Sequence, residues 1–68
     1  MALYAVRKVD MSNCKGVDEY IKAVNDAPVK HCYGLKEVFA YCGAKLHKGR
    51  SGYSGFFNNI EYTAVRIR

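Results

Sequence analysis

The chain has 68 residues, of which half are apolar, and its eleven Lys or Arg against six Asp or Glu give a formal net charge of +5. This composition excludes a disordered chain, and apolar runs of only a few residues exclude a membrane-spanning helix. We expect a single domain, residues 1–68, with no signal peptide and no membrane association. The basic balance favours anionic partners, although a charge of this size also serves solubility alone.

The three cysteines, Cys14, Cys32 and Cys42, are odd in number, and no two of them have CxxC spacing. A short secreted protein usually carries an even and denser set that forms disulfides. The pattern therefore indicates a cytoplasmic location, where the reducing environment keeps these residues as small buried thiols.

The first predicted element is a strand over residues 3–9, LYAVRKV, which begins with apolar side chains on both faces and so suits a central position in a sheet. A helix follows over residues 17–25, where apolar side chains recur at helical spacing. They are Val17, Tyr20, Ile21 and Val24. Pro28 ends this helix, because a proline pushes the residue before it out of the helical region.

Residues 29–33, VKHCY, fit either a short strand or an extended connector. Residues 35–48 form the clearest helix, with Gly49 as a left-handed cap. Its apolar stripe consists of Leu35, Val38, Phe39, Cys42 and Leu46. Gly43 lies inside this helix and disfavours it, so the helix either breaks there or is crowded by a neighbour.

The last third of the chain predicts a β-hairpin. GYSGFF and IEYTAVRIR flank Asn58-Asn59, and asparagine tolerates the positive φ angles of a two-residue type I′ turn. The element order is then β-α-(β)-α-β-β, where the bracketed strand is the uncertain segment 29–33. We expect an α+β domain with a three- or four-stranded, mainly antiparallel sheet and two helices packed on one face. The other face would be exposed to solvent or used for binding.

RSGYSGFF is similar to the aromatic strand of RNA-recognition motifs. Two features exclude that family. Ser54 interrupts the alternation of aromatic residues, and the aromatic strand follows both helices, whereas the family places it between them. No family is recognised.

Enzyme chemistry and bound cofactors are not indicated. The soft metal ligands His31, Cys32, Cys42 and His47 match no finger or knuckle spacing. No phosphate loop or dinucleotide fingerprint is present. Asp18 and Glu19 are adjacent on a helix, so they do not face each other as an acid–base pair. We therefore expect no enzyme, no metal site and no cofactor.

Basic side chains are the first candidate binding feature. Arg7 lies on the first strand, and Arg66 and Arg68 end the last one, so Arg7 and Arg66 or Arg68 would form one patch if these strands are neighbours. Lys45, Lys48 and Arg50 form a second group around the loop after the second helix. Glycines in this loop would let the backbone approach a phosphate closely.

Aromatic side chains are the second candidate feature. Tyr53, Phe56 and Phe57 could stack on bases, and because Phe56 and Phe57 are consecutive in a strand, they point to opposite faces. Six tyrosines in 68 residues is a high number, and tyrosine is enriched at protein interfaces. Tyr41 lies off the apolar stripe of its helix and is a candidate for exposure.

These features favour a small non-catalytic protein that acts by occupancy. The basic loop and hairpin would bind nucleic acid or a nucleoprotein. The alternative is a stand-alone inhibitor or adaptor, such as a phage-type accessory factor. It would dock a tyrosine-rich, basic surface onto an acidic patch of a target protein.

Overall fold

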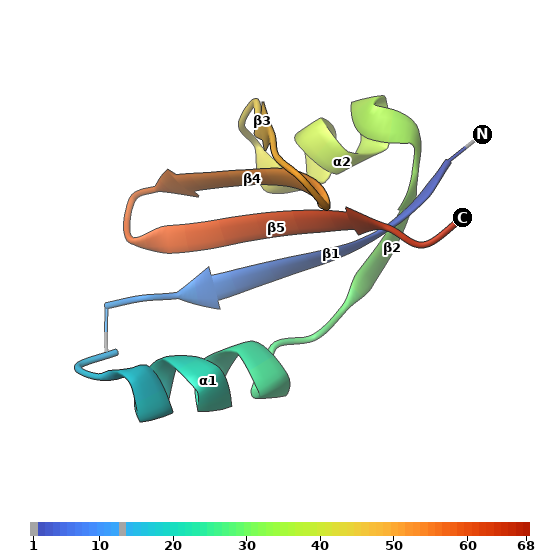
Figure 1. Ribbon diagram of the computed structural model, residues 1–68. Coiled ribbons are helices and arrows are strands. Elements are labelled where there is room, and N and C mark those ends of the chain that lie inside the picture. Colours follow the sequence, from blue (N-terminus) through green and yellow to red (C-terminus); the bar gives the residue numbers. More distant parts are fainter. Residues whose placement is uncertain (1, 13) are drawn as a thin grey trace.

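The computed structural model describes residues 2–12 and 14–68. Within these residues the chain forms a small α+β domain with two helices and a five-stranded antiparallel sheet (Figure 1). In chain order the elements are β1 (Leu3–Asp10), α1 (Val17–Asp26), β2 (Lys30–Tyr33), α2 (Gly34–Cys42), β3 (His47–Lys48), β4 (Gly52–Phe57) and β5 (Ile60–Arg66). The strands lie in the order β2-β1-β5-β4-β3. The α+β class and the antiparallel sheet are confirmed, and the predicted elements follow one another as expected, with one further strand, β3, between α2 and β4.

The register of the strands assigns each side chain to one of two faces. On β5, Ile60, Tyr62 and Ala64 point to one face, which we call the core face, while Glu61 and Val65 point to the other, which we call the open face. The pairing of β1 with β5 is unbroken from Tyr4 to Asp10. The assignment therefore holds along both strands.

Helix α2 packs on the core face. The buried cluster there combines residues of the sheet, of α2 and of the chain that follows α2. Its members are Tyr4, Val6, Cys32, Val38, Cys42, Leu46, Tyr62 and Ala64. The apolar stripe predicted for this segment is confirmed as core, because Val38, Cys42 and Leu46 are buried and Leu35 and Phe39 pack partly against them.

Gly43 ends α2, so the prediction of a helix reaching Lys48 is wrong. Gly43 has φ 69°, and its N–H donates to the carbonyl of Phe39. Glycine adopts this left-handed conformation without steric cost, which makes it a better stop signal than an internal helix position. Leu46 still reaches the core from the loop, because four residues of irregular chain return it to the same side. Residues His47–Lys48, predicted as the helix end, form β3 instead.

Helix α1 lies on the other side of the strands from α2 (Figure 1). The Tyr20 hydroxyl donates to Oε1 of Glu61, at 2.6 Å, and Glu61 belongs to the open face. Val9, on the same face of β1, is buried at 3% exposure. The expectation that both helices share one face is therefore wrong. Helical periodicity shows which side of a helix is apolar, but does not show which face of a sheet covers it.

The sheet also has more strands than expected. Residues Lys30–Tyr33 form β2 and pair with β1, which settles the uncertain segment as a strand. His47–Lys48 adds the short β3 at the other edge. The hairpin turn is as predicted, with Asn58 at φ 54° and Asn59 at φ 65°. Neither helix in residues 2–12 and 14–68 has the length and apolar character needed to cross a membrane.

Candidate anion-binding site

A basic pocket opens at the end of the sheet where β1 begins and β5 ends. Its volume is about 380 Å³, within the range of small-ligand sites. Three cationic residues line it, Lys48, Arg50 and Arg66, together with the side chains of Tyr4 and Tyr53. None of its eight lining residues, all in the described part of the chain, is acidic.

Strand pairing brings these residues together from three parts of the sequence. Tyr4 on β1 is the direct partner of Arg66 on β5, and Lys48 on β3 is the direct partner of Tyr53 on β4. All four point to the core face, the face on which α2 packs. The ring of Tyr53 packs edge-on against Tyr4 and Phe39, with centroids 6.2 and 6.0 Å apart. These contacts tie the pocket wall to the hydrophobic core.

The loop between β3 and β4 completes the pocket with Gly49, Ser51 and Gly52. The N–H of Gly49 donates to the carbonyl of Gly52 at 2.6 Å, which closes a tight turn. Gly52 has φ 151°, and a Cβ at this position would lie 2.0 Å from the carbonyl oxygen of Ala64. Only glycine allows β4 to begin this close to β5.

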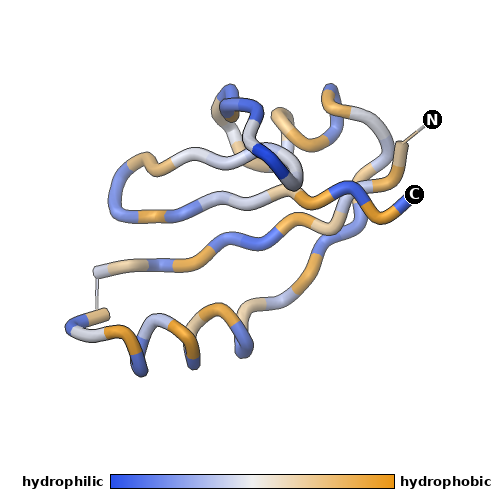
Figure 2. The backbone as a smooth tube through the Cα atoms, viewed as in Figure 1, coloured by the Kyte–Doolittle hydropathy of each residue, from blue (hydrophilic) through white to orange (hydrophobic). Residues whose placement is uncertain are grey.

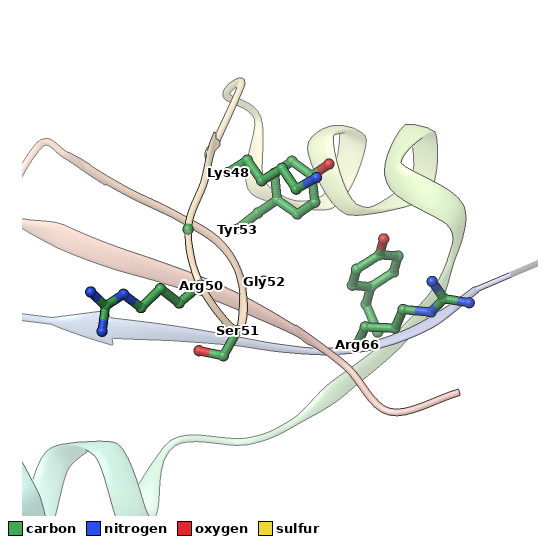
Figure 3. Close-up of a pocket in the computed structure, with 8 residues that line it drawn as sticks. Lys48, Arg50, Ser51, Gly52, Tyr53 and Arg66 are labelled. Atoms are coloured by element: carbon green, nitrogen blue, oxygen red, sulfur yellow. The ribbon is translucent and has the colours of Figure 1, made fainter.

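The three cations do not all point into the pocket. Figure 3 shows Lys48 beside Tyr53, while the side chains of Arg66 and Arg50 extend in opposite directions. Arg50 also lines a smaller hollow of about 180 Å³ together with Ser54, Thr63 and Val65, and these three belong to the open face. Lys48 and Arg66 line the basic pocket and not the smaller hollow, so they are the cations that we assign to the basic pocket. Arg50 is shared between the two hollows.

The other predicted basic residues lie elsewhere. β1 and β5 are neighbours, as the predicted patch required, but Arg7 pairs with Thr63 on the open face and Arg66 pairs with Tyr4 on the core face. Arg7 and Arg66 therefore do not form one patch. Lys45 is exposed in the loop after α2 and does not line the pocket. Arg68 is exposed, and its carbonyl accepts a hydrogen bond from Nε of Arg66, at 2.9 Å.

The aromatic candidates divide between the faces. Phe56 points to the open face and is 58% exposed, while Phe57 points to the core face and packs against Tyr62. Their opposite orientation is as predicted. Tyr41 is exposed, also as predicted, and Nζ of Lys8 lies 4.0 Å from the centre of its ring.

Sequence reasoning did not select Tyr4 and Ser51 as site residues. Tyr4 is the partner of Arg66 because β1 and β5, at the two ends of the chain, pair with each other. The register of strands so far apart in the sequence cannot be predicted from local sequence. Ser51 carried a usable signal, since it lies between Arg50 and Gly52 in the loop already chosen for its basic and glycine residues.

The cysteines and histidines form no such site. Within residues 2–12 and 14–68, no three His, Cys, Asp or Glu side chains gather in a group that could hold a metal ion. Cys32 and Cys42 are buried in the core, while Cys14 is half-buried. Burial raises the pKa of the Cys42 thiol above its usual value, so this residue stays protonated and is a poor nucleophile.

Comparisons with known proteins do not indicate a function for this chain. The chain matches no protein-family model, and comparisons with curated proteins and with solved structures also find no match.

Proposed function

We propose that this protein binds nucleic acid by occupancy, holding backbone phosphates in the basic pocket. The observation that carries the proposal is the placement of Lys48 and Arg66, from β3 and β5, around one cavity of about 380 Å³ whose lining contains no acidic residue. Phosphate contacts from lysine and arginine supply most of the affinity of proteins that bind nucleic acid without sequence preference.

The surroundings of the pocket support the same ligand. Between Glu37 and Glu61 the sequence contains Lys45, Lys48 and Arg50 and no Asp or Glu, so the loop side of the molecule has a positive potential. The glycines of the loop leave backbone close to the cavity, where amide groups can approach a phosphate oxygen. Tyr4 and Tyr53 add hydroxyl groups, which also donate to phosphates.

The direct test is fluorescence anisotropy with single- and double-stranded DNA and RNA of equal length over a series of salt concentrations. Affinity is expected to fall linearly on a log–log salt plot. K48A and R66A should each weaken binding and reduce the slope of that plot by about 1, as expected for the loss of one phosphate contact. R50A is expected to have a smaller effect, because its side chain extends away from Lys48 and Arg66.

The matched control is K22A, which removes one positive charge from the exposed surface of α1, a helix that contributes no residue to the pocket lining. It should leave the salt slope within error of the wild type. Absence of binding to any of the four nucleic acids at low salt would overturn the proposal. Binding that is lost equally in K22A and K48A would show a diffuse charge effect without a site. A target protein recognised with shallow salt dependence would favour docking on an acidic protein surface instead.

A further inference from the structure

We propose that the ligand of this protein is a single-stranded nucleic acid, which runs from the basic pocket around the loop between β3 and β4 and onto the open face. The proposal rests on the nucleic-acid binding proposed above and names the form of nucleic acid. Two features of the open face carry it, a row of hydrogen-bond donors and an exposed phenyl ring. Neither feature belongs to the lining of the basic pocket.

Four side chains that donate hydrogen bonds form one row across the open face. Arg7 on β1 is the direct partner of Thr63 on β5. Thr63 also pairs with Ser54 on β4, which in turn pairs with His47 on β3. The row therefore spans four strands and about 14 Å. Guanidinium, hydroxyl and imidazole groups all donate to phosphate oxygens, so a sugar–phosphate backbone can bind along the whole row.

The row is accessible, and little negative charge surrounds it on the sheet. Its members on β4 and β3, Ser54 and His47, are exposed, while the other two are half-buried. Among the strand residues that point to the open face, Glu61 is the one acidic residue. Its carboxylate already accepts the hydrogen bond from Tyr20. The row therefore suits an anionic backbone.

The loop between β3 and β4 joins the basic pocket to this row. Residues 49–53 line both the basic pocket and the smaller hollow of about 180 Å³. Ser54 and Thr63 of the row also line the smaller hollow. Figure 2 shows strongly hydrophilic positions along β3 and this loop, and Arg50 is the cation common to both hollows. Successive phosphates can therefore pass from the core face to the open face beside the loop.

A duplex cannot follow this path. The basic pocket lies on the core face and the row on the open face, so a ligand that touches both must turn sharply around residues 49–51. Double-stranded DNA has a persistence length of about 150 base pairs, and the longest dimension of this domain is 37 Å. A duplex therefore stays nearly straight over the whole molecule. A single strand is flexible enough to turn at the loop.

Phe56 gives a second reason for a single strand. It lies two residues beyond Ser54 on β4 and on the same face, about 7 Å further along the strand. Its ring is 58% exposed. Bases stack on exposed aromatic rings, and only a base outside a duplex offers its face for that contact. A strand whose backbone follows the row can place a base over Phe56.

Helix α1 limits the path on the β1 side. It lies on the open face, where Tyr20 meets Glu61. It carries three acidic residues against one basic residue, Lys22, and the acidic ones are Asp18, Glu19 and Asp26. These carboxylates repel phosphates. The strand therefore lies over β5, β4 and β3, and Arg7 forms the end of the row.

The test compares a thymidine single strand of about 15 nucleotides with a duplex of the same length, by fluorescence anisotropy. The wild type is expected to bind the single strand about fivefold more tightly or better, because only the single strand gains the base stack. F56A should weaken single-strand binding by about 5- to 150-fold, the effect of one lost stack. R7Q should reduce the salt slope for the single strand by about 0.7. Neither variant should change duplex binding.

The matched controls replace exposed residues outside this path. Y33A removes a ring that is 55% exposed on β2, at the opposite edge of the sheet from β3. K36A removes one positive charge from an exposed position of α2 that lines neither of the two basic hollows. Both should bind the single strand as the wild type does. Circular dichroism checks that each variant keeps its secondary structure.

The single-strand path and the basic pocket fail in different ways. Duplex binding as tight as single-strand binding would overturn the path, and so would single-strand binding that F56A and R7Q leave unchanged. In either case a loss of affinity in K48A and R66A would keep the basic pocket as the phosphate site. Absence of binding to every nucleic acid would overturn the proposed function and the path together.

Discussion

The core face and the open face belong to the same strands, but the chain covers them very differently. On the core face, Val6 of β1 and Val38 of α2 have no exposed surface. On the open face, Val17 and Ile21 of α1 and Phe56 of β4 remain largely in solvent. Full burial of an aliphatic side chain contributes about 1.5–3 kcal/mol, so the core face supplies most of the folding free energy. The open face contributes less, because several of its apolar side chains stay in contact with solvent.

The strongest way to test this division is a pair of matched valine substitutions, one in each helix. V38A removes methyl groups from the centre of the core and should lower the free energy of unfolding by about 2–3 kcal/mol. V17A makes the same chemical change on α1 at a mostly exposed site, where alanine's higher helix propensity should leave stability unchanged or slightly raised. Urea denaturation of both variants gives the comparison. Equal losses of unfolding free energy in the two variants would contradict the view that the core face supplies most of the folding free energy.

A smaller effect is expected at the contact that holds α1 to the open face. The hydrogen bond from Tyr20 to Glu61 raises the pKa of the Tyr20 hydroxyl above its usual value. Y20F should lower the free energy of unfolding by about 1 kcal/mol at neutral pH. Since the folded-state pKa is raised, this stabilisation is complete below about pH 10 and is lost as pH rises through the raised value.

The measurement is the difference in unfolding free energy between wild type and Y20F at neutral and alkaline pH. Other tyrosines and lysines titrate in both proteins, so the difference isolates Tyr20. It should shrink on the alkaline side. A difference that stays constant with pH would show that the hydroxyl contributes by packing and not by this hydrogen bond.

The last prediction concerns thiol labelling, which compares the segment before α1 with the core without changing any residue. Cys14 precedes α1 and is half-buried, while Cys32 and Cys42 lie in the core. A thiol reagent added to the native protein should label Cys14 first, and should reach the other two only on unfolding. Mass spectrometry of the labelled peptides identifies the order. Rapid native labelling of Cys42 would indicate that the core opens far more readily than its burial implies.

Much of the fold could be predicted from local sequence because its signals are local. The stripe from Leu35 to Leu46 identified the main core segment, and Asn58-Asn59 identified the hairpin turn. Gly43 was compatible with a position inside the helix or with a break in it. It forms the C-terminal cap, because a glycine at φ 69° ends the helix without strain. Spacing alone did not decide this, since Leu46 reaches the core with or without a continuous helix.

The site was predicted less completely because it depends on pairing between distant strands. Lys48, Arg50, Tyr53 and Arg66 were selected by residue type, and they do line one pocket. Arg7 was grouped with Arg66 because their strands were expected to be neighbours. The strands are neighbours, but Arg7 and Arg66 point to opposite faces. A shift of one residue in register exchanges the faces, and the sequence alone does not give the register. The sequence also did not predict that the sheet covers α1 only in part, because an apolar stripe does not show how much of it the rest of the chain will bury.

Gly52 has a consequence for how this protein can change over time. A Cβ there would lie 2.0 Å from the carbonyl oxygen of Ala64, whereas a Cβ at Gly49 would meet nothing closer than 3.6 Å. Positions 49 to 51 can therefore exchange residues, and with them the charge and hydrogen-bonding groups of the pocket rim, while position 52 stays glycine. The loop is a place where ligand preference can evolve without redesign of the sheet, because one fixed residue keeps the pocket in shape.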